Sequence, residues 1–171
     1  ETIYTCNVGD SRCILAQKTD NDDEELIAKA LSIDHKPDLI EEKKRILMNN
    51  GRVAPWCDED DQEQGPARVW LKYQDAPGLA MSRSFGDLVA TQLGVIAEPE
   101  IIKHTVTDND LFLILGSDGI FEFLDNQEII ELAQHGKDSK QACKYLFTEA
   151  TRQWKRNEEV IDDITVIVLH F

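Results

Sequence analysis

The feature that most constrains the fold is the apolar run at residues 111–115, which stops abruptly at Gly116-Ser117-Asp118-Gly119. A continuous apolar run of this length is typical of a strand buried on both faces. The two glycines let the backbone turn sharply and leave room for a ligand beside the Asp118 carboxylate. A carboxylate held at the end of a buried strand suits a hard divalent cation. Taken alone, the stretch is explained more simply by an Asx turn at Asp118.

The composition indicates a globular and strongly acidic chain. Its 171 residues are 42% apolar, enough for one domain with a core. The 18 basic and 33 acidic residues give a formal net charge of -15, which repels nucleic acid and anionic lipid. Neither nucleic acid nor a membrane is therefore an expected partner. An anionic substrate would be repelled as well, unless bound cations reversed the local field.

The cysteines and the first residue bear on the setting of the chain. Cys6, Cys13, Cys57 and Cys143 show no C-x-x-C spacing, and three of them lie in apolar patterns as expected of buried thiols. This usage predicts a reducing intracellular location, in the cytoplasm or nucleus. The chain begins at Glu1 inside a strand pattern, so we expect it to be a piece of a longer polypeptide.

Alternating apolar residues predict several strands. Residues 3–8 alternate, a turn signal follows at Gly9-Asp10-Ser11, and residues 12–17 continue as a second strand, which predicts a hairpin. Residues 100–106 and 111–115 are likewise predicted to be antiparallel neighbours. Two further strands are predicted at residues 26–33 and 164–171. A polar acidic loop is predicted at residues 19–25.

A few helices separate the strands. The first is predicted to begin near Pro37 and to end at Gly51. Capping boxes are predicted at Asp125 with Glu128 and at Asp138 with Gln141. The second opens a helix whose apolar stripe comprises Cys143, Leu146, Phe147, Ala150 and Trp154. Residues 52–78 are predicted to be an irregular excursion with a short strand near residues 68–73. The expected class is α+β with a mainly antiparallel sheet.

Three aspartates share one position, at a strand end or in the adjoining turn: Asp10, Asp118 and Asp162. If these strand ends meet, the carboxylates repel one another unless cations bind. Ligands that are all oxygen favour magnesium or manganese over zinc. A pair of such ions can clamp a phosphoryl group and lower the pKa of water, so that a phosphate ester is hydrolysed without a side-chain nucleophile.

Five motifs together resemble the metal-dependent type 2C protein serine/threonine phosphatases. They occur in that family's order and are Asn7-Val8-Gly9-Asp10-Ser11-Arg12, Asp34-His35-Lys36-Pro37, Ser82-Arg83-Ser84-Phe85-Gly86-Asp87, Ser117-Asp118-Gly119 and Asp162-Asp163-Ile164-Thr165. The resemblance implies an α-β-β-α sandwich of two antiparallel sheets flanked by helices, incomplete at the N-terminus. It also implies a dinuclear magnesium or manganese centre that hydrolyses phosphoserine and phosphothreonine on protein substrates through a metal-activated water.

The resemblance also suggests roles for individual residues. Asp118 and Asp162 match ligands of the dinuclear centre, and Asp10 matches an aspartate associated with a further, weaker metal site. Glu122 stands where the family often has another aspartate for that weaker site. His35 matches a family motif and is expected to brace a turn. Asn50 replaces a glycine after the first helix, and we expect it to tolerate the same positive φ.

Residues 54–78 correspond to the family's flap, a variable segment near the cleft. The acidic run at Asp58-Glu59-Asp60-Asp61 either favours basic sequence around a phosphosite or is simply a solvated loop. The sequence leaves both interpretations open. Reversal of these charges would distinguish them.

The Asp-Gly-His-Gly-Gly motif of the family, which supplies the metal-bridging aspartate, does not occur in these 171 residues. Two hypotheses follow: the chain is the C-terminal part of an active phosphatase and is nearly inactive alone, or it is a phosphatase-like binding module without catalysis. A nuclease is disfavoured by the negative charge and the lack of a basic patch. Missing strands would expose sheet edges, so self-association is a further hypothesis.

Overall fold

The computed structural model describes residues 1–19 and 25–171, so the acidic loop predicted at 19–25 lies largely outside the described residues. The chain forms two compact units. The first comprises Glu1–Asn7, Ser11–Ile33 and Glu100–Phe171, and the second comprises Val8–Asp10 and Asp34–Pro99. Each unit has its own hydrophobic core.

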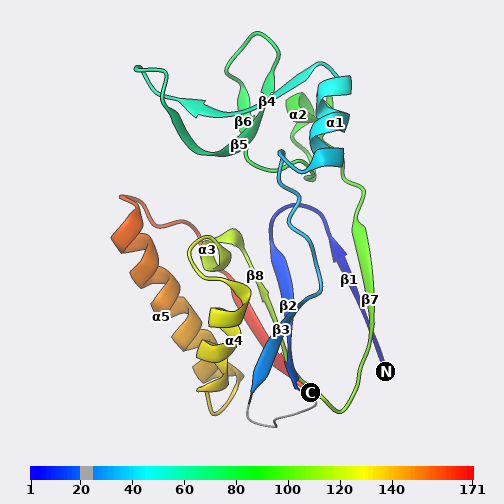
Figure 1. The fold of residues 1–171 in the computed structure, drawn as a ribbon, viewed down its shortest axis with the longest axis vertical. Coiled ribbons are helices and arrows are strands. Elements are labelled where there is room, and N and C mark those ends of the chain that lie inside the picture. The colour runs from blue at the N-terminus through cyan, green and yellow to red at the C-terminus, as the bar shows by residue number, and fades with distance from the viewer. Residues whose placement is uncertain (20–24) are drawn as a thin grey trace. The chain divides into compact units, whose positions relative to one another are not determined.

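The first unit contains two antiparallel sheets (Figure 1). The four-stranded sheet has the order β3-β2-β8-β9, with β3 at Leu26–Ala30, β2 at Arg12–Lys18, β8 at Asp110–Gly116 and β9 at Val166–His170. The two-stranded sheet pairs β1 (Thr2–Asn7) with β7 (Glu100–Thr105). The central strands β2 and β8 are buried, as the apolar run predicted.

Each face of the four-stranded sheet has a different cover. Helices α4 (Asn126–Gln134) and α5 (Ser139–Asn157) pack on one face, where Ile114 and Val168 meet Ile130 and Leu146. On the other face, called the inner face below, Leu15 and Leu113 pack with Ile3 of β1 and Ile102 of β7. The short helix α3 (Asp118–Phe121) follows β8. The predicted α+β sandwich of two antiparallel sheets flanked by helices is confirmed.

Both predicted strand pairings along the chain are wrong. Strand β1 pairs with β7 and not with β2, and β8 pairs with β2 and β9 and not with β7. The links at residues 8–11 and 106–109 carry the chain from one sheet to the other. Glycine and aspartate serve such a crossing as well as a hairpin turn, so the local turn signal could not separate the two.

Part of the inner face of the four-stranded sheet has no cover among the described residues. Leu115 and Ile167 are register partners, as are Leu113 and Leu169, and alternation places all four on the inner face. Leu113 is 7% exposed, but Leu115, Ile167 and Leu169 are 38%, 55% and 52% exposed. The inner face is therefore apolar and open along β9.

The helices of this unit begin largely as predicted. Asp125 and Glu128 form a complete capping box at α4. Asp138 caps α5 by accepting from the backbone N–H of Gln141, but the Gln141 side chain accepts from Lys137 N, so the second predicted box is only half formed.

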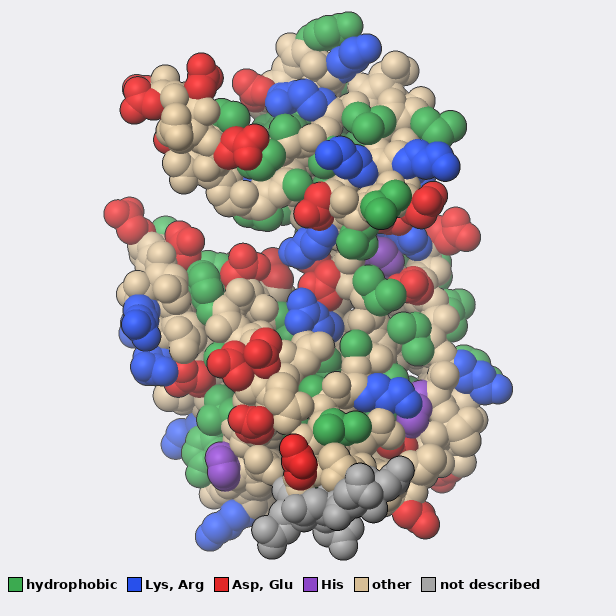
Figure 2. Space-filling model, viewed as in Figure 1, with side chains coloured by type: hydrophobic (Ala, Val, Ile, Leu, Met, Phe, Trp, Pro, Cys, Tyr) green, Lys and Arg blue, Asp and Glu red, His purple; other side chains and the backbone are tan. Residues whose placement is uncertain are grey.

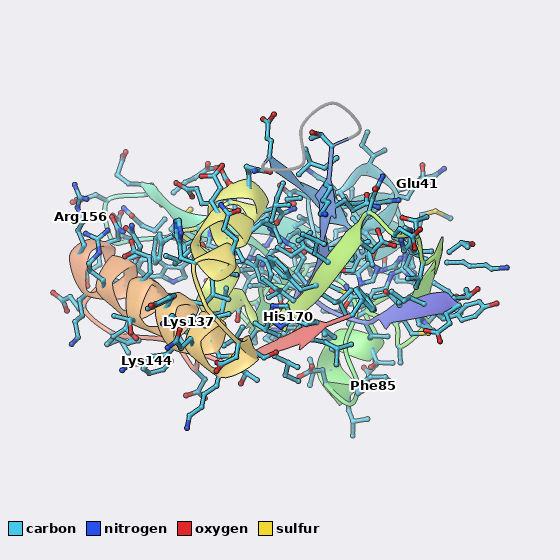
Figure 3. The ribbon with its side chains drawn as sticks, turned by 90° about the horizontal axis from the view of Figure 1, so that it is seen from below. Glu41, Phe85, Lys137, Lys144, Arg156 and His170 are labelled. Carbon is cyan, nitrogen blue, oxygen red and sulfur yellow. The ribbon has the colours of Figure 1, made fainter. Side chains whose placement is uncertain are left out.

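The 19-residue helix α5 is amphipathic, with buried Ala142, Leu146 and Ala150 on its inner face. Phe147, predicted on this stripe, is 52% exposed because it lies beside the stripe. Lys144 and Arg156 point away from the sheet (Figure 3). Within the described part of the chain, no helix is long and apolar enough to span a bilayer.

The second unit contains α1 (Ile40–Met48), α2 (Leu88–Thr91) and a three-stranded antiparallel sheet. Its strands are β4 (Gly51–Cys57), β5 (Glu63–Leu71) and β6 (Pro77–Leu79). The helix predicted near Pro37 begins three residues later, and Asn50 has the expected positive φ of 60°.

Residues 52–78 are not irregular as predicted, because β4, β5 and β6 form a sheet there; the short strand predicted near residues 68–73 overlaps β5. Gly65 and Pro66 suggested a break, but both lie in the exposed outer half of β5, where a strand tolerates them. The inner half of β5 is buried at Val69, which pairs with Val53 and packs with Ile46. Long-range packing therefore keeps this segment in a sheet.

All four cysteines lie in the described residues and are free thiols. Cys13 is buried, and burial raises the pKa of its thiol despite a hydrogen bond from Thr5. Cys143 is half-buried. Cys6 and Cys57 are exposed, so the prediction of three buried thiols is wrong, because the outer face of β1 that carries Cys6 is open.

Candidate metal centre

Two of the predicted metal ligands lie at the same edge of the four-stranded sheet. Asp118 follows the end of β8, and Asp162 precedes the start of β9. These strands are antiparallel neighbours, with Gly116 opposite Val166. The end of one and the start of the other therefore meet at one edge.

Ser117 joins these two segments through three hydrogen bonds. Its backbone N–H donates to Thr165 O at 3.0 Å. Its hydroxyl donates to Asp163 O at 3.0 Å and accepts from Thr165 N at 3.1 Å. The residue before Asp118 is thereby held against the segment that carries Asp162.

The two glycines of the motif accommodate the protein's own chain, whereas the sequence suggested room for a ligand. A Cβ atom at Gly119 would lie 2.5 Å from the carbonyl oxygen of Asp163, and one at Gly116 would lie 2.9 Å from the Phe121 ring. Contacts below 3.0 Å are excluded sterically. Glycine at 119 is thus required by the close approach of the Asp162–Asp163 segment.

Each candidate carboxylate is oriented by its own backbone. Asp118 Oδ1 accepts from Gly119 N at 3.0 Å, and Asp162 Oδ1 accepts from Asp163 N at 2.7 Å. Asp118 is half-buried and Asp162 is exposed. Glu122 is also exposed and lies one helical turn after Asp118, whose carbonyl accepts from Glu122 N. Its carboxylate therefore projects from the same side of the chain as Asp118.

These oxygen donors fit magnesium or manganese by type but not by number. Octahedral Mg²⁺ needs several fixed oxygen ligands, part of which water supplies. Within residues 1–19 and 25–171, no group of three His, Cys, Asp or Glu side chains is arranged to hold a metal ion. Asp118 and Asp162 therefore form at most a partial ligand set.

Asp10 belongs to the second unit and has a cationic partner there. Lys36 Nζ lies 2.7 Å from Asp10 Oδ2, and the Asp10 side chain is 9% exposed. A buried carboxylate requires such a partner, since an isolated charge would be costly to desolvate. The predicted role of Asp10 at a weaker metal site stays a prediction.

The expectation that His35 braces a turn is confirmed. His35 is buried, and its backbone N–H donates to Gly9 O at 2.9 Å while its Nδ1 accepts from Gly9 N at 3.1 Å. The carbonyl of His35 also accepts from Ser82 N at 2.7 Å. Three of the family-like motifs are therefore joined within the second unit by one histidine.

Comparison with known proteins identifies the family. The family model described as "Protein phosphatase 2C" matches residues 1–159. The chain belongs to the protein phosphatase 2C family. It is 41% identical to "Probable protein phosphatase 2C 73" of Arabidopsis thaliana over 99% of this chain and 44% of that protein. It is 37% identical to "Probable protein phosphatase 2C 48" of rice (Oryza sativa subsp. japonica), over 100% of this chain and 48% of that protein.

Solved structures agree on the fold. The serine-threonine phosphatase 2C from Toxoplasma gondii superposes with a TM-score of 0.82 at 24% identity, covering 99% of this chain and 54% of that one. A second phosphatase from a pathogenic strain of Toxoplasma gondii gives a TM-score of 0.71 at 25% identity, over 99% of this chain and 49% of that one. The chain thus spans about half the length of its relatives.

Sequence reasoning missed a buried carboxylate in this phosphatase 2C chain. Glu42 is 4% exposed and accepts from both Arg45 and Arg83, with Nη2 of the latter 2.8 Å from Oε1. The Ser82 hydroxyl also donates to it. Burial alone would raise the pKa of Glu42, but these hydrogen bonds hold it well below its usual range. Glutamate and arginine three residues apart commonly pair on exposed helix surfaces. The local sequence around Glu42 and Arg45 therefore did not indicate that Glu42 is buried.

A second missed cluster surrounds His104, to which the sequence assigned no role. His104 Nε2 lies 2.7 Å from Asp110 Oδ2, and Lys29 Nζ lies 3.2 Å from Nδ1. Asp110 also accepts from Thr107 N and from the Gln17 amide. Burial alone would raise the pKa of Asp110, but the hydrogen bonds from His104, Thr107 and Gln17 lower it. The cluster braces the link between β7 and β8.

The acidic run of the predicted flap lies in the β4–β5 hairpin, and acidic side chains gather on the tip of this hairpin in Figure 2. Asp58 has a structural role there, because its carboxylate accepts from Asp60 N, Gln62 N and the Gln64 amide. These bonds lower the pKa of Asp58, the bond from Gln62 N most. A test of substrate charge should therefore leave Asp58 in place and reverse Glu59, Asp60 and Asp61.

Proposed function

We propose that this chain is the C-terminal part of the catalytic domain of a metal-dependent protein serine/threonine phosphatase. The observation that carries the proposal is the joining of the Asp118 and Asp162 segments by Ser117. That arrangement keeps two carboxylates at one sheet edge. A chain without catalytic use for paired carboxylates has no physical reason to hold two repelling charges together.

Asp118 and Asp162 would hold the metal ions in the longer polypeptide. When bound, a pair of such ions polarises a phosphoryl group and lowers the pKa of water. Glu122 would contribute from the same face of α3 through an intervening water. The cations would also offset the formal net charge of -15, which otherwise repels a phosphorylated substrate.

The remaining metal ligands are proposed to come from residues of the longer polypeptide that lie outside residues 1–171. The relatives are about twice as long as the aligned region. The family resemblance implies a bridging aspartate in an Asp-Gly-His-Gly-Gly motif, which residues 1–171 do not contain. The open inner face at Leu115, Ile167 and Leu169 supports this proposal, because additional strands would bury it. A hollow of about 420 Å³ beside Ser117 and Thr165 adjoins the same face.

Residues 1–171 alone are therefore expected to be nearly inactive toward a phosphothreonine peptide in manganese. They are also expected to self-associate through the open inner face of the four-stranded sheet, because burial of exposed apolar surface against a second copy is favourable. Sedimentation at high concentration tests the second expectation, and a monomer would contradict it.

The buried and half-buried free thiols support an intracellular location, in the cytoplasm or nucleus.

The decisive experiment uses the full-length polypeptide that contains this chain. Manganese-dependent hydrolysis of a phosphothreonine peptide is expected, and Asp118→Ala and Asp162→Ala should each reduce kcat/KM at least 100-fold. Asp108→Ala removes an exposed carboxylate from the β7–β8 link and serves as the matched control. Equal activity of all four proteins would refute the proposal.

A second candidate function is a phosphatase-like module that binds a partner without catalysis. The absence of a three-ligand group in the described residues and the Lys36–Asp10 ion pair favour it. The same assay separates the two. A full-length protein that binds the phosphopeptide but never releases phosphate would support the module.

A further inference from the structure

Helix α3, which begins with Asp118, is too short to define its own position. It contains four residues, and its N-cap residue Ser117 makes no side-chain capping hydrogen bond. A single helical turn is not stable without external contacts, because nucleation costs more than its few hydrogen bonds return. The orientation of Asp118 therefore depends on what α3 touches.

Trp154, near the end of α5, provides one such contact. Its indole Nε1 donates to the carbonyl oxygen of Gly119 at 2.8 Å. The same ring packs edge-on against Phe123, with ring centroids 4.9 Å apart. Because Gly119 lies within α3 and Phe123 lies two residues beyond its end, Trp154 contacts both this helix and the chain that follows it.

Gly119 receives contacts from two directions. Trp154 holds its carbonyl, and the Asp163 carbonyl lies where a Cβ atom would be. Asp163 is in turn held by the Ser117 hydroxyl. The Asp118 turn is thus fixed between the end of α5 and the segment that carries Asp162, and a change at Trp154 releases one side.

We propose that Trp154 is a positioning residue: through its hydrogen bond to Gly119 it sets the separation of the Asp118 and Asp162 carboxylates, and with it the affinity for manganese. The inference rests on the proposed function. Outer contacts that orient metal ligands commonly change metal affinity by 10- to 100-fold. Because Trp154 contributes a single neutral hydrogen bond and acts on Asp118 only through the backbone, we expect a change in manganese affinity near the lower end of that range.

The test is Trp154→Phe in the full-length polypeptide, which removes the N–H donor and keeps an aromatic ring. Titration with Mn²⁺ alone, followed by calorimetry, should show affinity weakened about tenfold. Trp70→Phe is the matched control, since Trp70 Nε1 donates to Ala54 O at the same 2.8 Å within the second unit. Its Mn²⁺ affinity should change less than threefold.

If Trp154→Phe weakens Mn²⁺ binding less than threefold relative to Trp70→Phe, the inference is overturned. Should Trp154→Phe fail to fold, Ser117→Ala and Ser117→Thr decide. Ser117→Ala loses both hydroxyl bonds to the Asp162–Asp163 segment, so it should weaken Mn²⁺ binding about tenfold, and Ser117→Thr should restore it. Equal affinities of these two variants would overturn the inference.

Asp118→Ala separates the inference from the proposed function. Loss of Mn²⁺ binding in Asp118→Ala together with normal binding in Trp154→Phe would reject the positioning role alone. A wild-type protein that binds no Mn²⁺ would reject both.

Discussion

The carboxylate of Glu42 and the guanidinium of Arg83 form a buried ion pair that links α1 to the Ser82–Asp87 motif of the second unit. Arg45 contacts the same carboxylate, with its Nη2 2.6 Å from Oε2. Two cations and one anion thus share a site in which the carboxylate side chain is 5% exposed and the two arginine side chains are 19% and 23% exposed. Such a site is sensitive to the loss of its central charge, because both guanidinium groups would remain.

Glu42→Gln is accordingly expected to lower the free energy of unfolding by about 3–5 kcal/mol, the range for removing one partner of a buried pair. Urea unfolding at neutral pH measures the change. Glu41→Gln is the control, since Glu41 is exposed and 4.0 Å from Lys44. A loss of equal size in both variants would contradict a special role of the buried site.

The contribution of Glu42 should depend on pH in a defined direction. Its pKa is lower in the folded chain than the ordinary 4.5, so its ionised form stabilises the fold above that value. The difference in unfolding free energy between wild type and Glu42→Gln should be constant above about pH 6 and shrink as pH falls below about 4. Urea unfolding at pH 7, 5 and 3 checks this, and a difference that grew on acidification would contradict it.

Asp110→Asn should lower the free energy of unfolding by about 2–3 kcal/mol, because hydrogen bonds to a buried charged group are among the stronger ones. The side chain of Asp110 is fully buried and accepts from His104, Gln17 and Thr107. Asp108→Asn, an exposed change in the same link, should stay within about 0.5 kcal/mol. Thermal or urea unfolding of the two variants side by side measures the difference.

Gly119→Ala should destabilise the chain by about 1–3 kcal/mol, the usual cost of overpacking, because the new Cβ meets a backbone oxygen that cannot move freely. Manganese affinity of the full-length polypeptide should fall as well. A Cβ atom at Gly65 would meet no atom within 4 Å, so the only cost of Gly65→Ala is the strain of alanine in a left-handed backbone conformation. This control variant should leave manganese affinity unchanged. Unchanged affinity in both variants would show that the close approach at Gly119 does not affect the carboxylates.

Asn50 has φ of 60°, a left-handed conformation. Asn50→Gly should change the free energy of unfolding by less than about 0.5 kcal/mol, and Asn50→Ala should lower it by about 1 kcal/mol. Asparagine tolerates this conformation better than other residues with a Cβ atom. Urea midpoints of the two variants test the assignment. A more stable alanine variant would contradict the left-handed turn.

Several features of the site were predictable because the signals are local. The buried strand before Gly116, the turn at Asp118 and the capping box at Asp125 follow from residues within a few positions of one another. The family resemblance is also local, since each motif is a short string. These signals placed Asp118 and Asp162 at strand ends before any strand was paired.

The partners of those strands were not predictable in the same way. Glycine and aspartate at residues 9–10 serve a crossing between sheets, where a hairpin was expected. The burial of Glu42 and His104 depends on Arg83 and Asp110, and the support of Gly119 depends on Trp154, 35 positions away. Sequence by itself determined most strands and the longer helices of the first unit, their order along the chain, and the candidate carboxylates. Tertiary structure alone decided which strands pair and which side chains hold those carboxylates in place, because packing joins residues that no local pattern connects.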